Sequence, residues 1–454
     1  MGRLLKDISR LTVETFAFGP AGNLLDQKTQ ELNRPLEADP RRNNLLREYA
    51  GTHYKYDERG NLIYRLHNGS HAHFTWDLFD RLASYNDDKL KVDYSYDALG
   101  RRLHKHSVAH FWDRPEAGTG WNQLQRAKRQ RELGCGFTLF GWDGDTLAWE
   151  SSPPRDEGDT GRTVHYLYEP GSFVPVAQAL RNSPIRLHKQ PDWSQREYDF
   201  DQDPLWHTEV KPQAFDAIAW YHCDHLGTPM ELTDEQGNVA WAGQYKAWGE
   251  VKEERSDWAK QHGLANPIRF QGQYHDHETG LHYNRYRYYD PKAGRFVSLD
   301  PISYAGGINL LVYAPSPVDW IDPLGLAAEG QLGSYGGLTG PEHKKDDLDA
   351  HELVRNKALA QMGCSGGSRM DSNPSIALTR SQHVNVHRHE TALSREHLGT
   401  NGKNEFEFGA DGKPSKRQMD VWQGALRKSG MSAAQARRLR KQSNAFLKNM
   451  CCCN

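Results

Sequence analysis

The sequence contains little cysteine, and none of it in a metal-binding arrangement. Six cysteines occur in 454 residues, and three of them are adjacent at the extreme end, at positions 451–453. Zinc modules use closely spaced cysteine pairs, and small secreted folds use well-separated cysteines that form disulfides. Neither arrangement is present. This excludes a cysteine–zinc module and a disulfide-dependent fold, and it indicates a protein made in a reducing cytoplasm.

Long apolar runs are also missing. No stretch of about eighteen apolar residues occurs, which argues against a membrane span. The first residues, 1–11, lack the apolar segment of a signal peptide and read as the middle of a repeat, so we expect a fragment of a longer protein. Mean hydropathy is −0.84, yet 11% of residues are aromatic. Disordered segments are poor in aromatics, so we expect an ordered chain of two or more domains.

Net charge is nearly absent from the whole chain, but not from its parts. The totals are 57 Lys and Arg against 59 Asp and Glu. Residues 327–454 carry 19 against 13, and residues 1–326 carry 38 against 46, which gives net charges of +6 and −8. An acidic body with a basic tail is expected when only the tail meets nucleic acid, although a difference of this size also arises by ordinary scatter.

A pattern of alternate aromatics, a glycine-containing turn and a leucine recurs along the first part of the chain. Its clearest copy is 94–103, which reads Y-S-Y-D-A-L-G-R-R-L, and similar segments begin at Phe16, Tyr54 and Trp76. Alternate residues of a strand share one face. Asp with Gly supplies the turn that leads into the return strand. The pattern therefore predicts an array of β-hairpins.

Two segments, 105–165 and 183–215, interrupt this pattern. The first contains the basic stretch 122–133, for which we predict a short, solvated helix. After the second interruption, the tetrapeptide 222–225 (H-C-D-H) offers three potential metal ligands. Because neighbouring strand residues point to opposite faces, we interpret these side chains as structural rather than metal-binding.

The segment 269–326 differs from the repeats because short motifs follow one another closely along it. These motifs are R-F-Q-G at 269–272, Y-N-R-Y-R-Y-Y-D-P at 283–291, G-R-F at 294–296, D-P at 300–301 and D-P-L-G-L at 322–326. The segment resembles, over its whole length, the closing part of the core of the Rhs, or YD-repeat, proteins. With the hairpin repeats, the resemblance covers residues 1–326. It implies a curled hairpin shell that ends here, and a variable toxin that begins after it.

Two aspartates of this segment, Asp300 and Asp322, each precede a proline. In the proteins that it resembles, two such aspartates cut the chain after the last leucine of the motif, which here is the bond Leu326–Ala327. Two carboxyls held close together cannot both ionise cheaply, so one stays protonated and polarises the carbonyl while the other activates water. Arg295 is the candidate for tuning one of them. The alternative is that both Asp-Pro pairs simply begin turns.

Composition changes after residue 326, where the glycine-rich stretch 327–337 predicts a linker. Beyond it lie five residues with metal-binding or acid–base chemistry: His351, Glu352, Asn373, His383 and His387. The last two are four residues apart, so on a helix they share one face and can hold a divalent cation.

This group is similar to the motif of the HNH (His-Me finger, ββα-metal) nuclease toxins. The resemblance implies a small α+β domain over 327–454 and one divalent ion, of which Mg, Zn, Mn and Ni are all candidates. In those proteins a strand histidine, a loop asparagine and two helix histidines surround the metal. By this resemblance His383 and His387 hold the ion and Asn373 orients the loop. The ion stabilises the scissile phosphate while His351 deprotonates water.

The sequence departs from many relatives at Glu352, where they have a second histidine. Either His351 is the base and the helix pair holds the metal, or His351 is a ligand and Glu352 takes another role. His389 or Glu390, on the same expected helix, offers a further ligand or a hydrogen bond that orients one.

The end of the tail is expected to be mainly helical. Residues 404–408 alternate like a short strand, and 416–448 predicts two helices separated at Gly430. The second helix carries a basic cluster that we interpret as a phosphate contact, with a solvated helix face as the alternative. The cluster consists of Arg437, Arg438, Arg440 and Lys441.

These features predict a mostly β chain, with a hairpin shell over 1–326, closed by 269–326, and an α+β nuclease-like domain over 327–454. The resemblances imply an antibacterial effector with a metal-dependent DNase, made in the cytoplasm and delivered into target cells by type VI secretion. Its implied partners are DNA, a cognate immunity protein and a spike or PAAR element. The alternatives are an RNase toxin, or a non-enzymatic adhesion scaffold with a binding module. An adhesion scaffold has no need of both the aspartate pair and the histidine group.

Overall fold

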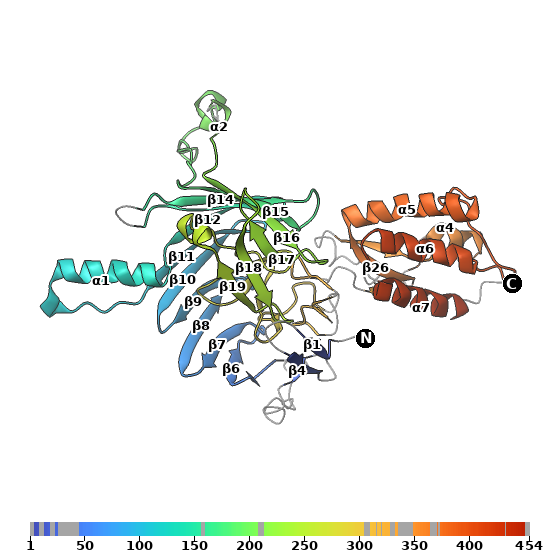
Figure 1. The fold of residues 1–454 in the computed structure, drawn as a ribbon, viewed down its shortest axis with the longest axis horizontal. Helices are drawn as coiled ribbons and strands as arrows, with labels where there is room; N and C mark the ends of the chain where they lie inside the picture. The colour runs from blue at the N-terminus through green and yellow to red at the C-terminus, as the bar shows by residue number, and fades with distance from the viewer. Residues whose placement is uncertain are drawn as a thin grey trace.

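The chain is dominated by a single sheet whose strand order follows the sequence throughout (Figure 1). The computed structural model describes residues 4–8, 13–18, 23–25, 45–155, 159–207, 213–303, 309–314, 316–318, 320–326, 332–334, 348–363, 370, 373–431 and 433–449. The sheet has 15 strands, and each pairs antiparallel with its sequence neighbours. They are β5 (Glu48–Tyr49), β6 (Thr52–Tyr56), β7 (Leu62–His67), β8 (Ser70–Trp76), β9 (Leu82–Asp87), β10 (Leu90–Tyr96), β11 (Arg102–Ala109), β12 (Phe137–Asp143), β13 (Thr146–Ser152), β14 (Arg162–Tyr168), β15 (Pro175–Arg181), β16 (Ala217–Cys223), β17 (Pro229–Thr233), β18 (Val239–Tyr245) and β19 (Val251–Arg255). The mostly β prediction is confirmed.

One repeated turn explains why these hairpins form. The Asp97 Oδ1 atom accepts hydrogen bonds from the N–H groups of Leu99 and Arg101, at 2.9 and 2.8 Å. Its Oδ2 atom pairs with the Arg101 guanidinium at 2.7 Å. Gly100 takes the positive φ of 81° that the turn requires. The same pair of backbone bonds is made by Asp57, Asp77, Asp224 and Asp234.

The core segment 269–326 packs on one face of the curved sheet. Its strands form a separate antiparallel meander of β20 (Gln273–His275), β21 (His282–Asn284), β22 (Arg287–Asp290) and β23 (Arg295–Phe296). Side chains of β8 and β10 alternate between buried and exposed, as a strand with one wet face does. Their buried members share a hydrophobic core with Tyr283 and Tyr288 of the core segment. The YD-type hairpins and the core segment therefore fold as one layered structure.

Each of the two sequence interruptions contains a helical excursion from the sheet (Figure 1), although the first interruption also contributes strands β12 and β13 to the sheet. The first holds α1 (Thr119–Glu132), preceded by the 3-10 helix η1 (Pro115–Ala117), and this confirms the helix predicted over 122–133. The second holds η2 (Phe200–Gln202) and α2 (Pro204–His207). A third short helix, α3 (Asp257–Gln261), follows β19. Near the N-terminus, two small sheets pair β1 (Lys6–Ile8) with β2 (Val13–Thr15), and β3 (Ala17–Phe18) with β4 (Leu24–Leu25).

The tail combines a three-stranded sheet with helices. The sheet has the order β24 (Leu332–Ser334), β26 (Pro374–Thr379), β25 (Leu348–Glu352). The helices are α4 (Asn356–Gln361), α5 (Arg380–Leu398), α6 (Lys416–Lys428) and α7 (Ala433–Asn449). A hydrophobic core formed only by tail residues, among them Trp422, lies between them. The boundary at residue 326 stays a prediction, because 327–331 lie outside the described residues.

Two predictions about the end of the tail have different outcomes. The two helices over 416–448 are confirmed, and Gly430 separates them with φ of 100°. The strand over 404–408 is wrong, since an isolated bridge from Phe408 to Pro414 is the β pairing found in that described segment. The backbone of Glu407 is used instead at the start of α6, where it bonds Gln418 and Ser415.

No helix within the described ranges has both the length and the apolar character needed to cross a bilayer.

Candidate functional site

The first candidate site is the turn 322–326, at the end of the core segment, where it is buried against the rest of that segment. The Asp322 Oδ1 atom accepts the N–H groups of Gly325 and Leu326, both at 2.9 Å, and closes the turn on itself. Gly325 has φ of 75°, a conformation that favours glycine. The side-chain amide of Asn284 donates to the Asp322 carbonyl at 2.8 Å, so the β21–β22 turn fixes this segment from outside. Asp322 itself is fully buried.

Arg287, on β22, joins the two predicted aspartates. Its Nη2 atom lies 3.1 Å from Asp300 Oδ2 and 3.2 Å from Asp322 Oδ2. The same nitrogen donates to the Leu326 carbonyl oxygen at 3.1 Å. The guanidinium lies over the Phe296 ring, 3.6 Å from its centroid, and only 1% of the side chain is exposed. One buried cation thus holds both carboxylates and polarises the carbonyl of the predicted scissile bond.

The structure places a different arginine between the two predicted aspartates. Arg295 was the candidate for tuning the carboxylates, but the position between Asp300 and Asp322 belongs to Arg287. Arg295 pairs with Asp290 in the β22–β23 ladder and bridges to Val312. The sequence signal for Arg287 was its place in the Y-N-R-Y-R-Y-Y-D-P string. That string contains Arg285 and Arg287. The sequence alone does not show which of these two side chains points to the aspartates.

Burial gives Asp322 the protonation behaviour that acid catalysis needs. Loss of water contact raises the pKa of Asp322 to about 7, and the nearby Asp300 adds to this rise. Arg287 and the N–H groups of Leu326 and Gly325 act in the opposite direction without cancelling it. Near neutral pH this carboxyl is therefore divided between its protonated and ionised forms.

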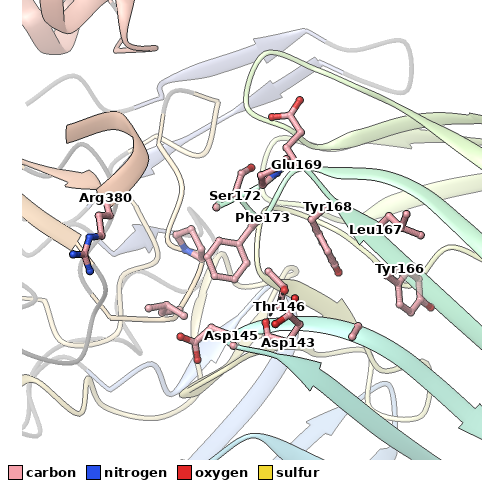
Figure 2. Close-up of a pocket in the computed structure, with 16 residues that line it drawn as sticks. Asp143, Asp145, Thr146, Tyr166, Leu167, Tyr168, Glu169, Ser172, Phe173 and Arg380 are labelled. Atoms are coloured by element: carbon pink, nitrogen blue, oxygen red, sulfur yellow. Dashed lines mark hydrogen bonds between the residues drawn. The ribbon is translucent and has the colours of Figure 1, made fainter. Parts of the chain in front are cut away.

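A hollow of about 640 Å³ lies beside the same turn (Figure 2). Phe173, from the β14–β15 connection, stands in its wall and also packs against the Leu324 and Leu326 side chains. Pro323 and Arg380 line it, whereas the two aspartates do not. The hollow therefore borders the predicted cleavage turn rather than containing its reactive groups.

The second candidate site brings together three of the predicted histidines. His351, on β25, has its ring centroid 5.2 Å from those of His383 and His387, which lie 4.6 Å apart on α5. One nitrogen of each ring lies within 4.8 Å of those of the others. Burial lowers the pKa of His383 to about 4 and also lowers that of His351. Neutral imidazoles at this spacing fit a divalent metal ion.

Acidic and basic side chains surround these histidines. Asp349 Oδ2 lies 3.2 Å from His383 Nδ1. Glu390 is buried, with its Oε2 atom 3.1 Å from His387 Nδ1 and its Oε1 atom 3.5 Å from His351 Nε2. Burial acts to raise the pKa of Glu390, but its bonds to the His351 and His387 rings bring it to about 2. Sequence reasoning singled out Glu390 but not Asp349, which lies two residues before His351 on the same strand face.

Arg355 was also missed from the sequence. Its Nη1 atom pairs with Glu390 and lies 2.5 Å from His387 Nδ1. Its position just before α4 carried no motif. It supplies a positive charge beside the three histidines.

Glu352 and Asn373 form a separate contact next to this group. Asn373 donates its side-chain amide to Glu352 Oε1 and to the Val354 carbonyl, both at 2.9 Å. Glu352 and Asn373 are both buried. The predicted role of Asn373, orientation of the loop, therefore has a physical counterpart in its bond to Glu352. His351 lies with the helix histidines, so the geometry favours its role as a ligand over its role as the base.

The basic cluster of α7 is only partly available for a ligand. Arg440 pairs with Asp420 and donates to Gln423 at 2.8 Å, both on α6. Arg437 and Lys441 are exposed, and the side chain of Arg438 lies outside the described residues. Helix α6 contacts both α5 and α7 (Figure 1), so the cluster lies on a different helix from His383 and His387. Phosphate contact by the cluster stays a prediction.

The tetrapeptide 222–225 has structural partners. His222 bonds Thr233, His225 bonds the Val318 carbonyl, and Asp224 closes its own turn. Among the described residues, the group with metal-ligand geometry is that of His351, His383 and His387.

Two protein families match the hairpin part of the chain. The RHS protein family matches residues 218–255, and the Teneurin YD-shell family matches residues 1–110. Double-stranded DNA deaminase toxin A of Burkholderia cenocepacia is 33% identical over 353 residues, which is 74% of this chain and 21% of the relative. Toxin protein Tse5 of Pseudomonas aeruginosa is 36% identical over 62% of this chain and 19% of that protein. Probable deoxyribonuclease RhsA of Dickeya dadantii is 31% identical over 62% of this chain and 16% of that protein.

The chain spans about a fifth of the length of these relatives. The family matches fall on the Asp-turn hairpins, and the structure arranges these in one antiparallel meander. The relatives that cover most of this chain carry Rhs or toxin names. The matches identify the hairpins of this chain as Rhs-type (YD-repeat) structure.

Proposed function

We propose that the chain is part of a toxin that cuts itself after Leu326 and releases a metal-dependent DNase. The observation that carries the first half is the Arg287 guanidinium, which contacts Asp300, Asp322 and the Leu326 carbonyl together. Turns that only begin at Asp-Pro pairs require no such convergence. Toxin and deoxyribonuclease names among the relatives support the second half.

In the proposed cut, ionised Asp300 takes a proton from water, and the water oxygen attacks the Leu326 carbonyl carbon. Protonated Asp322 and Arg287 stabilise the negative charge that develops on the carbonyl oxygen. The carbon–nitrogen bond then breaks, a proton passes to the leaving nitrogen, and the products are a carboxyl group on Leu326 and an amine on Ala327. Division of the chain into residues 1–326 and 327–454 is part of this proposal.

The rate of self-cleavage is expected to fall as pH rises through about 7. Asp322 must be protonated to act as the acid, and its pKa of about 7 means that the protonated fraction drops about tenfold per pH unit above that value. The measurement is the amount of the two pieces on denaturing gels after refolding between pH 5 and 9. A rate that instead grows steadily from pH 7 to pH 9 contradicts Asp322 as the acid.

For the tail, we propose that His351, His383 and His387 hold one divalent ion. When bound, the ion supplies positive charge to a scissile phosphate. Asn373 holds Glu352 at 2.9 Å, and Glu352 is the proposed base that takes a proton from water. Asp349 and Glu390 lie 3.2 and 3.1 Å from ring nitrogens of His383 and His387 and would limit the orientations of these two rings.

Chelation is expected to abolish DNA cleavage by the tail. EDTA should lower the rate of plasmid cleavage by the purified chain about a hundredfold or more, because the histidines alone cannot neutralise a phosphate. Three imidazoles suit zinc or nickel better than magnesium or manganese, which prefer oxygen ligands. Readdition of zinc or nickel should therefore restore more cleavage on agarose gels than readdition of magnesium or manganese does. Cleavage of total RNA but not of plasmid favours the RNase alternative, and full activity in EDTA contradicts the metal proposal.

The partners follow from this function and are proposals as well. DNA of a competing cell is the substrate, an immunity protein protects the producer, and a spike or PAAR element of a type VI apparatus carries the toxin across. Expression in a bacterium tests the whole proposal. The unmodified chain should be toxic, and the His383→Ala variant should not. Equal growth with both chains would contradict the toxin proposal and would favour the alternative, in which the tail is a binding module on an adhesion scaffold.

A further inference from the structure

Strand β22 presents successive residues to two different parts of the molecule. Arg287 points to the predicted aspartates, whereas Tyr288 points to the hairpin sheet, because neighbouring strand residues face opposite ways. Tyr288 is 2% exposed. Its ring centroid lies 6.0 Å from that of Tyr94 and 6.5 Å from that of Trp76, both in the hairpin repeats. The strand that carries the cleavage arginine is thus packed directly on the YD-type aromatics.

A directed set of hydrogen bonds joins Tyr288 to these hairpins. The Arg102 Nη1 atom donates to the Tyr288 hydroxyl at 3.3 Å. The Tyr96 hydroxyl donates to the Leu82 carbonyl at 2.8 Å and lies 3.0 Å from the Tyr288 hydroxyl. Since the proton of Tyr96 is used on Leu82, Tyr288 is the donor of the bond between the two tyrosines. The two tyrosine hydroxyls therefore have one arrangement of their protons in which all of these hydrogen bonds are formed.

The ion pairs of Arg102 and its neighbour Lys105 link the hydrogen bonds of Tyr288 to the packing of the core segment on the hairpin sheet. Arg102 is 1% exposed on β11, and its guanidinium pairs at 2.5 Å with Asp276, which is fully buried. Lys105 lies three residues further along β11, on the same buried face because the register shifts by a bulge between Arg102 and His104, and it pairs with Glu278 at 2.7 Å. Breaking a buried pair leaves an uncompensated charge, which is strongly destabilising. The hairpin β10–β11 and the core segment therefore satisfy their charges only when they lie against each other.

We propose that Tyr288, Tyr96 and Arg102 are positioning residues that allow self-cleavage only when β22 is docked on the β10–β11 hairpin. This inference rests on the proposed self-cleavage. The contact of Arg287 with the Leu326 carbonyl spans 3.1 Å, and a displacement of about 1 Å at a reacting group costs about a hundredfold in rate. The shell then acts as a folding checkpoint, since an incompletely assembled hairpin array holds Arg287 away from the bond.

The test compares two tyrosine-to-phenylalanine substitutions in the whole chain. Tyr288→Phe removes only the hydroxyl that joins β22 to Tyr96 and Arg102. Tyr221→Phe is the matched control, because its buried hydroxyl also makes two bonds, to Gln178 and Asn266, and none to β22. We expect both variants to lose a similar amount of thermal stability. The rate of self-cleavage after refolding should fall about tenfold only in Tyr288→Phe, and Tyr96→Phe should give a similar loss.

The outcomes separate this inference from the function on which it rests. If the unmodified chain stays intact, or if Asp322→Asn is cut normally, the self-cleavage proposal itself is wrong. If the unmodified chain is cut and Tyr288→Phe and Tyr96→Phe are cut at the rate of Tyr221→Phe, the positioning role is overturned. The double variant Tyr96→Phe/Tyr288→Phe should lose less rate than the two single losses combined, because both single variants remove the bond between the two hydroxyls. Additive losses would contradict a shared contact.

Discussion

Replacement of Arg287 by lysine is expected to leave the 51.8 kDa chain in one piece. A lysine keeps the charge, but it has no second nitrogen. It cannot hold the Gly325 carbonyl, as Arg287 Nε does, while another nitrogen contacts Asp300, Asp322 and the Leu326 carbonyl, as Nη2 does. Loss of one donor at a developing oxyanion typically costs about a hundred- to a thousandfold in rate. The measurement is the fraction of cut chain over time on denaturing gels, with mass spectrometry to locate the new amino terminus at Ala327.

The matched control is Arg295→Lys. Arg295 is also buried in the core segment, yet it lies on β23 in the ladder with Asp290 rather than between the two aspartates. We expect this variant to be cut at nearly the unmodified rate, provided that thermal denaturation shows it to be folded. Normal cleavage of Arg287→Lys together with loss of cleavage in a folded Arg295→Lys would restore the arginine chosen from the sequence.

The hairpin shell could be predicted because the residues that form each turn are close together in the sequence. The Asp97 turn needs only residues 97–101, since one carboxylate accepts two N–H groups within four residues. A glycine at the position of positive φ completes it. Even where the third copy places Asp80 at that position, the residue adopts φ of 57° and the turn is kept. Turns of this kind can be recognised from sequence alone, because all of the residues that form them are neighbours in the chain.

The buried ion pairs could not be predicted, because their members are far apart in the chain. Arg102 meets Asp276 only because β11 and β20 lie on the two faces of one core. No spacing rule connects two residues that are 174 positions apart. The choice between Arg287 and Arg295 presents the same difficulty, since it depends on strand register. The strand predicted over 404–408 failed for the opposite reason, because alternation alone does not provide a partner strand.

In the tail, the sequence identified the residues but left their roles open. His383 and His387 share a helix face, as their spacing predicted. The position of His351 beside them follows from the pairing of β25 with β26, which places His351 opposite Ile376. Spacing carries no information about that pairing. Asp349 and Arg355 lack a motif and gain their significance only from contacts with His383, His387 and Glu390.

The roles of the adjacent pair His351 and Glu352 give the second large expected effect. Glu352→Gln should lower the rate of plasmid cleavage by about a hundred- to ten-thousandfold, the usual loss on removal of a general base. Its metal affinity should be unchanged, because Glu352 bonds Asn373 and the metal-ligand group consists of the three histidines. His351→Ala should lower both cleavage and metal affinity. The measurements are gel-based cleavage rates and calorimetry with zinc, made on untagged protein so that no added histidine competes.

His389→Ala is the control for these variants, because it removes a histidine from the same helix α5 but outside the three-histidine group. It should keep metal affinity and cleavage near the unmodified values. If His351→Ala binds zinc normally and loses only cleavage, while Glu352→Gln still cuts, then His351 is the base and the helix pair holds the ion alone. If both variants and the His383→Ala variant cut DNA at the full rate, the three histidines have no catalytic part. The buried contacts of Glu390 with His351 and His387 would then be explained as a structural ion-pair network, with Arg355 as its counter-charge.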